Sequence, residues 1–153
     1  MEKYCLDLRV ADREQLSPHH VLLKLTSDEA LPHTLPGQFV NLRADQGGRP
    51  LLRRPISICE VVDKDHFVLI YKVVGDGTSK LSQLPAGHHL GVLGPLGNGY
   101  PLCEEEAEVL LIGGGVGVPP LYELAKRYRR IDRKVIVVLG FNDAESVFYV
   151  DAF

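Results

Sequence analysis

The sequence has no tryptophan, and only 7% of its 153 residues are aromatic. Its charges nearly cancel, because 17 lysines and arginines stand against 20 aspartates and glutamates, which gives a net charge of −3. Proteins that hold nucleic acid need a basic surface for the phosphates and commonly use aromatic rings to stack the bases. We therefore expect no nucleic-acid partner.

Long apolar runs are also lacking. The longest charge-free apolar stretch, residues 109–122, is interrupted by glycines and prolines and is well short of the roughly 20 residues that a spanning helix needs. Charged residues, among them Glu2, Lys3, Asp7 and Arg9, interrupt the start of the chain, so we expect no signal peptide. These features predict a cytoplasmic protein with no membrane partner.

Cysteine is scarce: Cys5, Cys59 and Cys103 are far apart, and the sequence has no C-x-x-C pair. This pattern favours free thiols over a disulfide framework, and the apolar neighbours predict that all three are buried and structural. In the pairs His19-His20 and His88-His89, adjacent side chains on a strand would point to opposite faces. We assign no metal site.

The first hundred residues are typical of short antiparallel strands. Apolar side chains alternate with polar ones in residues 4–10 and again in 21–25, and this period of two indicates half-buried strands. Further strands are predicted at 39–42, 56–62 and 67–74, separated by turns rich in glycine and aspartate. Five or six strands at this spacing predict an antiparallel β barrel over residues 1–103.

The pattern changes at Glu108. Residues 109–112 are continuously apolar, as in a strand that is buried on both faces of a parallel sheet, and residues 135–139 predict a second such strand. Between them, Pro119 suits a first helical turn, and an apolar face recurs at helical spacing in Leu121, Leu124, Ala125 and Tyr128. Residues 104–153 therefore predict the opening β-α-β unit of a nucleotide-binding α/β domain, which we expect to be incomplete because such sheets usually have four to six strands.

A glycine cluster follows the first of these buried strands. It consists of Gly113, Gly114, Gly115 and Gly117, and Pro119 follows it. Glycines between a strand and a helix let the backbone approach a pyrophosphate, which the helix N-terminus attracts. The G-x-G-x-G spacing departs from the usual dinucleotide fingerprint, and the alternative is a tight turn with no ligand.

Two other segments could contact a phosphate. Arg54-Pro55-Ile56-Ser57 places a guanidinium group and a hydroxyl on an extended segment, and arginine suits bidentate phosphate binding. The loop Gly75-Asp76-Gly77-Thr78-Ser79 offers backbone donors and hydroxyls. Taken singly, the first could be a solvated strand edge and the second a plain glycine turn.

Taken in order, these motifs resemble the ferredoxin reductase family. The resemblance rests on Arg54-Pro55-Ile56-Ser57, Tyr71-Lys72-Val73-Val74-Gly75-x-Gly77-Thr78, Gly94-Pro95-Leu96-Gly97-Asn98-Gly99 and the glycine cluster with Pro119-Pro120-Leu121. It covers residues 4–153. Within the family the chain looks most like the N-terminal portion of the electron-transfer subunits of bacterial dihydroorotate dehydrogenase, because Ile56 stands where many other members have tyrosine.

The resemblance implies an FAD site and an NAD(H) site. Arg54 would neutralise the flavin pyrophosphate, and Pro55, Ile56 and Ser57 would lie against the isoalloxazine. The remaining implied contacts are Ile70, Tyr71 and Lys72 with the ribityl or adenosine part, Gly77 and Thr78 with a phosphate, and Gly113, Gly114, Gly115, Gly117 and Pro119 with NADH.

The implied chemistry is hydride transfer from NADH to the flavin and one-electron release to an iron–sulfur centre, so no catalytic acid or nucleophile is needed. The partner would be the catalytic subunit of dihydroorotate dehydrogenase. Family members carry a [2Fe–2S] cluster on a later cysteine-rich segment, and we expect none in this chain because three scattered cysteines do not supply its ligands. Two alternatives remain: an FAD subunit of another NAD(P)H–ferredoxin oxidoreductase or hydrogenase-associated reductase, and a non-catalytic flavin-binding module.

Overall fold

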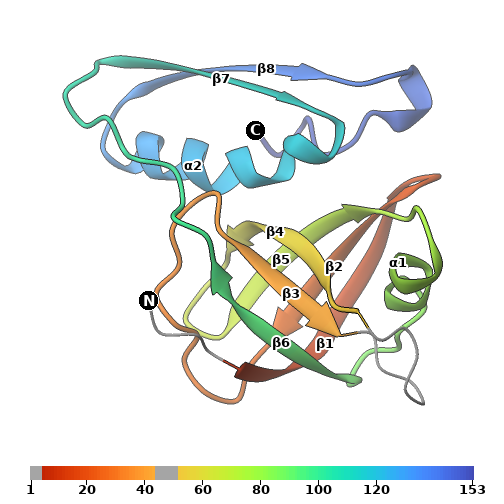
Figure 1. Cartoon of the computed structure of the whole chain (residues 1–153). Coiled ribbons are helices and arrows are strands. Elements are labelled where there is room, and N and C mark those ends of the chain that lie inside the picture. Colours follow the sequence, from red (N-terminus) through yellow and green to blue (C-terminus); the bar gives the residue numbers. More distant parts are fainter. Residues whose placement is uncertain (1–4, 44–51) are drawn as a thin grey trace.

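Six antiparallel strands close into a barrel in a computed structural model that describes residues 5–43 and 52–153 (Figure 1). Around the barrel the order is β1-β2-β5-β4-β3-β6. The strands are β1 (Cys5–Ser17), β2 (His20–Thr26), β3 (Phe39–Arg43), β4 (Arg54–Val61), β5 (His66–Lys72) and β6 (His89–Leu96). The predicted antiparallel barrel is confirmed.

The barrel interior is filled by the apolar side chains that alternate along the strands. Leu8 and Val10 of β1 and Val21, Leu23 and Leu25 of β2 are almost completely buried. Each such side chain contributes roughly 1.5–3 kcal/mol when it leaves water. Closure of the barrel also pairs every strand on both sides, which leaves no open edge.

One segment read as a loop is helical. Residues that follow β5 form α1 (Asp76–Leu81), with Gly75 at its N-cap. The buried Thr78 hydroxyl shapes this start: it accepts hydrogen bonds from the amides of Val74 (3.0 Å) and Gly75 (3.2 Å) and donates one to the Gly75 carbonyl (3.0 Å). The sequence predicts a glycine turn at residues 75–79. The hydrogen bonds of the Thr78 hydroxyl instead cap the start of a short helix there.

The second lobe is a β-α-β unit, as predicted. It contains β7 (Glu108–Gly114), the 3-10 turn η1 (Gly115–Gly117), α2 (Pro119–Arg130), β8 (Lys134–Gly140) and the short turn η2 (Ala144–Ser146). β7 and β8 pair in parallel, and α2 lies between this sheet and the barrel (Figure 1). The predicted apolar face of α2 is buried.

The prediction that β7 and β8 are buried on both faces is wrong for this structure. Leu110 and Ile112 of β7 are 56% and 69% exposed, and Ile136 and Val138 of β8 are 38% and 50% exposed. Their neighbours in sequence face α2, and because strand side chains alternate, these four point the other way. No described residue packs over that outer face closely enough to bury it.

The cysteine prediction holds for one residue of three. Cys59 is fully buried beside the second lobe, whereas Cys5 and Cys103 are exposed. Cys5 is the first residue of β1, and Cys103 lies in the connector between β6 and β7. Neither position lies within a packed core, so both side chains are exposed. Among the described residues, no helix is long and apolar enough to span a membrane.

Candidate functional site

A cavity of about 360 Å³ opens where β4, the end of β5, the start of α1 and η1 meet, a size within the usual range for ligand pockets. Its walls combine the predicted residues of the barrel with two valines. They are Arg54, Pro55, Ile56, Ser57, Ile70, Tyr71, Lys72, Val74, Thr78 and Val116. The fold therefore brings the two separate barrel motifs to one place.

Arg54 lines this cavity, and Gly77, which is not among the lining residues, lies directly against the Arg54 side chain. The Arg54 guanidinium donates from Nη1 to the carbonyls of Leu52 (2.9 Å) and Arg53 (3.4 Å). It passes so close to α1 that a Cβ on Gly77 would lie 2.2 Å from Nε. Gly77 thus lets the Arg54 guanidinium lie against the first turn of a helix, where amides lack intrahelical partners. Such a cation beside free amides can bind an anion.

The Thr78 hydroxyl is already engaged. It donates its proton to the Gly75 carbonyl, so donation to a phosphate would need the hydroxyl to rotate away from this carbonyl. Its contribution is to hold the loop that presents the backbone amides of α1. The backbone amides of this loop are further donors beside the hydroxyl.

β4 presents alternate residues to the outside of the barrel. Pro55 is exposed and Ser57 is half-buried, whereas Ile56 packs in the barrel core with only 9% exposed. The outer face thus offers a rigid ring and a hydroxyl to a bound molecule. Ile56 supports this wall mainly from behind.

The neighbouring strand β5 continues this wall. Ile70 packs against Phe148 and Cys59, and Lys72 is half-buried. Tyr71 is a core residue whose hydroxyl has no hydrogen-bond partner among the described residues, and burial raises the pKa of this phenol. Apolar packing therefore fixes this wall, with the Lys72 ammonium group at its rim.

Two lining residues were missed in the sequence. Val74 is 77% exposed on the barrel side, and Val116 is 51% exposed on the second lobe. Both stand next to glycines of a motif. An apolar residue inside a glycine-rich loop was the available signal, because such a residue has no core to enter. Val116 makes the cavity a site shared by both lobes.

The glycine cluster divides into two roles. A Cβ on Gly113 would lie 2.6 Å from Leu121 Cδ1 and 3.2 Å from the Gly117 carbonyl, so Gly113 permits close packing of strand and helix. Gly115 has a positive φ of 50°, and a Cβ on Gly117 would meet nothing within 4 Å. Gly115 and Gly117 therefore form an open loop at the cavity edge, whereas Pro119 is buried in the first turn of α2.

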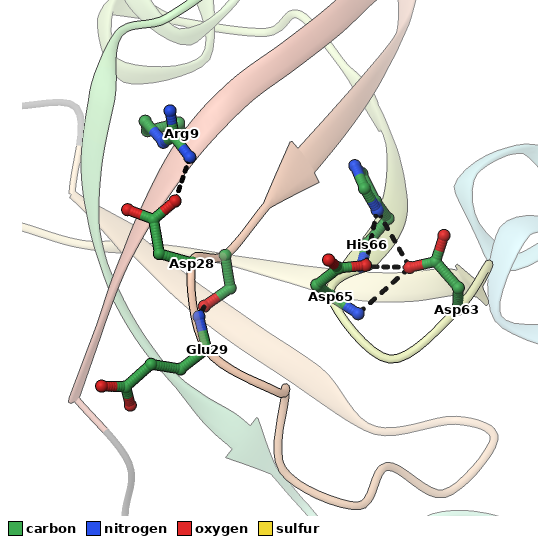
Figure 2. Close-up of polar contacts among 7 residues, drawn as sticks. Arg9, Asp28, Glu29, Asp63, Asp65 and His66 are labelled. Atoms are coloured by element: carbon green, nitrogen blue, oxygen red, sulfur yellow. Dashed lines mark hydrogen bonds and ion pairs between the residues drawn. The ribbon is translucent and has the colours of Figure 1, made fainter.

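A polar cluster lies in the turn between β4 and β5 (Figure 2). One oxygen of Asp63 accepts from the amides of Asp65 (3.1 Å) and His66 (2.8 Å), and His66 Nδ1 is 2.9 Å from both carboxylates. Hydrogen bonds from the side chain and amide of Asp65, and from His66, lower the pKa of Asp63. The cluster stabilises the turn, and we assign no metal to it.

Comparison with known proteins agrees with this geometry. Residues 7–100 match the family described as "Oxidoreductase FAD-binding domain", and they include the whole barrel except its first two described residues. The chain belongs to this oxidoreductase FAD-binding domain family. FAD is thus the cofactor that the barrel of this family member binds.

Similar proteins carry more specific names. The chain is 41% identical over 150 residues to a Fusobacterium nucleatum "Dihydroorotate dehydrogenase B (NAD(+)), electron transfer subunit", a match covering 96% of the chain and 58% of that protein. A Bacillus cereus protein of the same name is 50% identical over 121 residues, covering 77% and 47%. The chain thus spans about half the length of the curated relatives it matches.

Solved structures show the same fold. An Amycolatopsis cytochrome P450 reductase superposes with a TM-score of 0.85 at 25% identity, over 99% of this chain and 47% of that one. An NADH-dependent reduced ferredoxin-NADP oxidoreductase studied for flavin-based electron bifurcation superposes at 0.83 and 30% identity, over 95% and 52%. This FAD-binding domain therefore has a ferredoxin-reductase-like fold, as predicted.

Proposed function

We propose that this chain is the FAD-binding part of an electron-transfer subunit that passes electrons between NAD(H) and the catalytic subunit of a dihydroorotate dehydrogenase in the cytoplasm. The observation that carries the proposal is the shared cavity, which joins the Arg54–Ser57 wall of the barrel to Val116 of the second lobe. The names of relatives at 41–50% identity supply the acceptor class.

The residues present fit FAD. The Arg54 guanidinium against Gly77 forms a cationic cradle that a Cβ would fill, and charge-assisted bonds from such a group suit a diphosphate. The outer face of β4, with Pro55 and Ser57, suits a flat ring with a polar edge. Ile70, Tyr71 and Lys72 would lie along the remaining part of the cofactor.

When bound, FAD supplies an acceptor that takes two electrons as a hydride and releases them singly. The protein's task is orientation and exclusion of water. Ser57 would donate a hydrogen bond to the polar edge of the ring, and Arg54 would balance the phosphate charge. Val74 and Val116 would shield the ring from solvent, which strengthens polar interactions inside the cavity.

The nicotinamide nucleotide would approach from the second lobe. Gly113, Gly114, Gly115, Gly117 and Pro119 form the strand-to-helix turn, and its open loop at Gly115–Gly117 lies beside the cavity through Val116. A backbone without side chains lets a pyrophosphate come close to the helix start. This arrangement would bring a nicotinamide ring to the flavin between the lobes.

The proposal is tested with FAD-loaded protein under anaerobic conditions. Addition of NADH should bleach the flavin absorbance, and added dihydroorotate dehydrogenase catalytic subunit should form a stable complex with the protein on gel filtration. Bound flavin that NADH leaves oxidised would contradict the proposal and favour a non-catalytic flavin module.

A matched pair of variants tests the site itself. Arg54→Ala should lower FAD retention, whereas Arg53→Ala removes the same charge but should not. Arg53 donates instead to the carbonyls of Asn41 (3.2 Å) and Gly91 (2.7 Å) on the barrel wall. Equal FAD content in both folded variants would exclude Arg54 from the site.

A second acceptor is favoured by one observation. The structure at 30% identity is named as a ferredoxin-NADP oxidoreductase, so the electrons could pass to a ferredoxin-type protein. If reduced protein transfers electrons to a ferredoxin and binds no dihydroorotate dehydrogenase, this second assignment replaces the first.

A further inference from the structure

Glu123 is a buried carboxylate that no motif explains. It lies on α2, the helix between the barrel and the small sheet (Figure 1), and is only 2% exposed. A buried charge is costly unless it is paired and hydrogen-bonded. Its partners therefore indicate what the fold uses it for.

Glu123 bonds across the boundary between the lobes. Its Oε2 accepts a hydrogen bond from the backbone amide of Val61, the last residue of β4, at 3.2 Å. Three cations of α2 surround the carboxylate: Lys126 at 3.8 Å, Arg127 at 3.5 Å and Arg130 at 3.6 Å. The carboxylate thus links one backbone atom of the barrel to a cationic turn of the helix.

Two of these cations reach the barrel themselves. Lys126 Nζ lies 2.5 Å from a carboxylate oxygen of Glu60 on β4, and Arg127 donates to the Thr34 carbonyl at 2.5 Å. Glu123 and these two cations therefore contact the barrel at three places: the Val61 amide, the Glu60 carboxylate and the Thr34 carbonyl.

The two elements that Glu123 joins also form the two sides of the cavity. β4 begins with Arg54 and carries Ser57 four residues before Val61, a distance of roughly 13 Å along a strand. α2 starts directly after the loop that carries Val116, and Glu123 lies in its second turn. β4 and α2 thus connect the Val61 contact to the two sides of the cavity, and the register of β4 with β5 shifts between Ile58 and Glu60 on the way.

We infer that Glu123 is a positioning residue. It sets the spacing between Pro55 and Ser57 of β4, where the flavin ring would lie, and the Gly115–Gly117 loop before α2, which would receive the nicotinamide nucleotide. The inference rests on the proposed function, because the spacing matters only if a hydride crosses it. Hydride transfer is sensitive to such spacing: a misplacement of about 1 Å can slow a reaction by about a hundredfold.

The test compares Glu123→Ala and Glu123→Gln with Glu108→Gln as the matched control. Glu108 pairs with Lys134 at 2.5 Å, but this pair is exposed and lies within the second lobe. Four quantities are measured on FAD-loaded protein: amide hydrogen exchange at Val61, bound FAD per chain, the limiting rate of anaerobic flavin reduction by NADH, and the NADH concentration for half-saturation.

In Glu123→Ala, exchange at Val61 should rise at least tenfold and the limiting rate should fall about ten- to hundredfold. Bound FAD and the NADH concentration for half-saturation should stay within about twofold, because no cofactor-contacting group is removed. Glu123→Gln keeps an acceptor for Val61 and loses the charge, so its rate should fall less. If the alanine variant does not fold, Glu123→Gln still tests the positioning role through its limiting rate. The Glu108→Gln control should match the parent.

The outcomes separate the two claims. Unchanged Val61 exchange in Glu123→Ala would overturn the contact between the lobes, whatever the flavin does. Lost protection with an unchanged limiting rate would overturn the positioning role. A parent protein whose flavin NADH does not reduce would overturn the proposed function and the role in transfer, while Val61 exchange would still decide the contact.

Discussion

Gly77→Ala should weaken FAD binding without weakening the fold. The new Cβ would lie 2.2 Å from Nε and 2.6 Å from Cζ of Arg54. These atoms are the far end of a flexible side chain, so the guanidinium can swing away. Alanine in a helical turn is favoured over glycine by up to about 1 kcal/mol, which offsets the local crowding. The unfolding free energy should therefore change by less than about 1 kcal/mol.

The loss in affinity follows from the displaced cation. A charge-assisted hydrogen bond contributes about 1.5–3 kcal/mol, so FAD affinity should fall about ten- to 150-fold. Fluorescence titration with FAD measures this loss. Gly75→Ala is the matched control, because a Cβ there meets nothing within 4 Å and the backbone is extended. Its affinity should equal that of the parent.

A double variant sharpens the test. If Gly77→Ala acts by moving the Arg54 guanidinium, it should cause little further loss in an Arg54→Ala background, since coupled residues are not additive. Full additivity of the two losses would refute this reasoning. So would an unchanged affinity in Gly77→Ala alone.

Three further predictions concern stability. Gly113→Ala should destabilise the second lobe by about 1–3 kcal/mol, because its Cβ would clash with Leu121. Gly117→Ala places its Cβ in open space and should lower the free energy of unfolding by less than about 1 kcal/mol. Urea unfolding measures both. Thr78→Val should cost about 1–3 kcal/mol in the same assay, because the buried hydroxyl has three hydrogen bonds, and an unchanged midpoint would show that they are dispensable. Burial, followed by the charges of Lys72 and His19, lowers the pKa of His20 from 6.5. As pH drops below about 6.5, the unfolded chain binds a proton at His20 before the folded chain does, so the free energy of unfolding should fall. His20→Gln should flatten this part of the pH profile of stability.

The barrel and the helix face could be predicted because their signals are local. Alternation places Leu8, Val10 and Leu23 inside the barrel, and helical spacing places Leu124 and Tyr128 against the sheet. The outer face of β7 and β8 could not be predicted in the same way. A continuous apolar run shows that a strand can be buried on both faces, but not what covers each face.

The sequence motifs predicted which barrel residues lie near one another, but not the details of their contacts. Arg54, Ser57, Lys72 and Thr78 all line one cavity, because β4 and β5 are neighbouring strands and α1 directly follows β5. The hydrogen bond that the Thr78 hydroxyl donates to the Gly75 carbonyl, by contrast, depends on the short helix α1, which the sequence did not predict. Val116 and Glu123 depend on how the two lobes meet, which no single segment of the sequence contains.

The central claim is that the cavity between β4, β5 and η1 holds FAD, and a crystal structure of the FAD-loaded protein tests it most directly. The account predicts density for the diphosphate against Arg54 and Gly77, with the flavin ring over Pro55 and Ser57 and facing Val116. FAD bound elsewhere on the protein, with the Arg54 guanidinium free of phosphate, would contradict it.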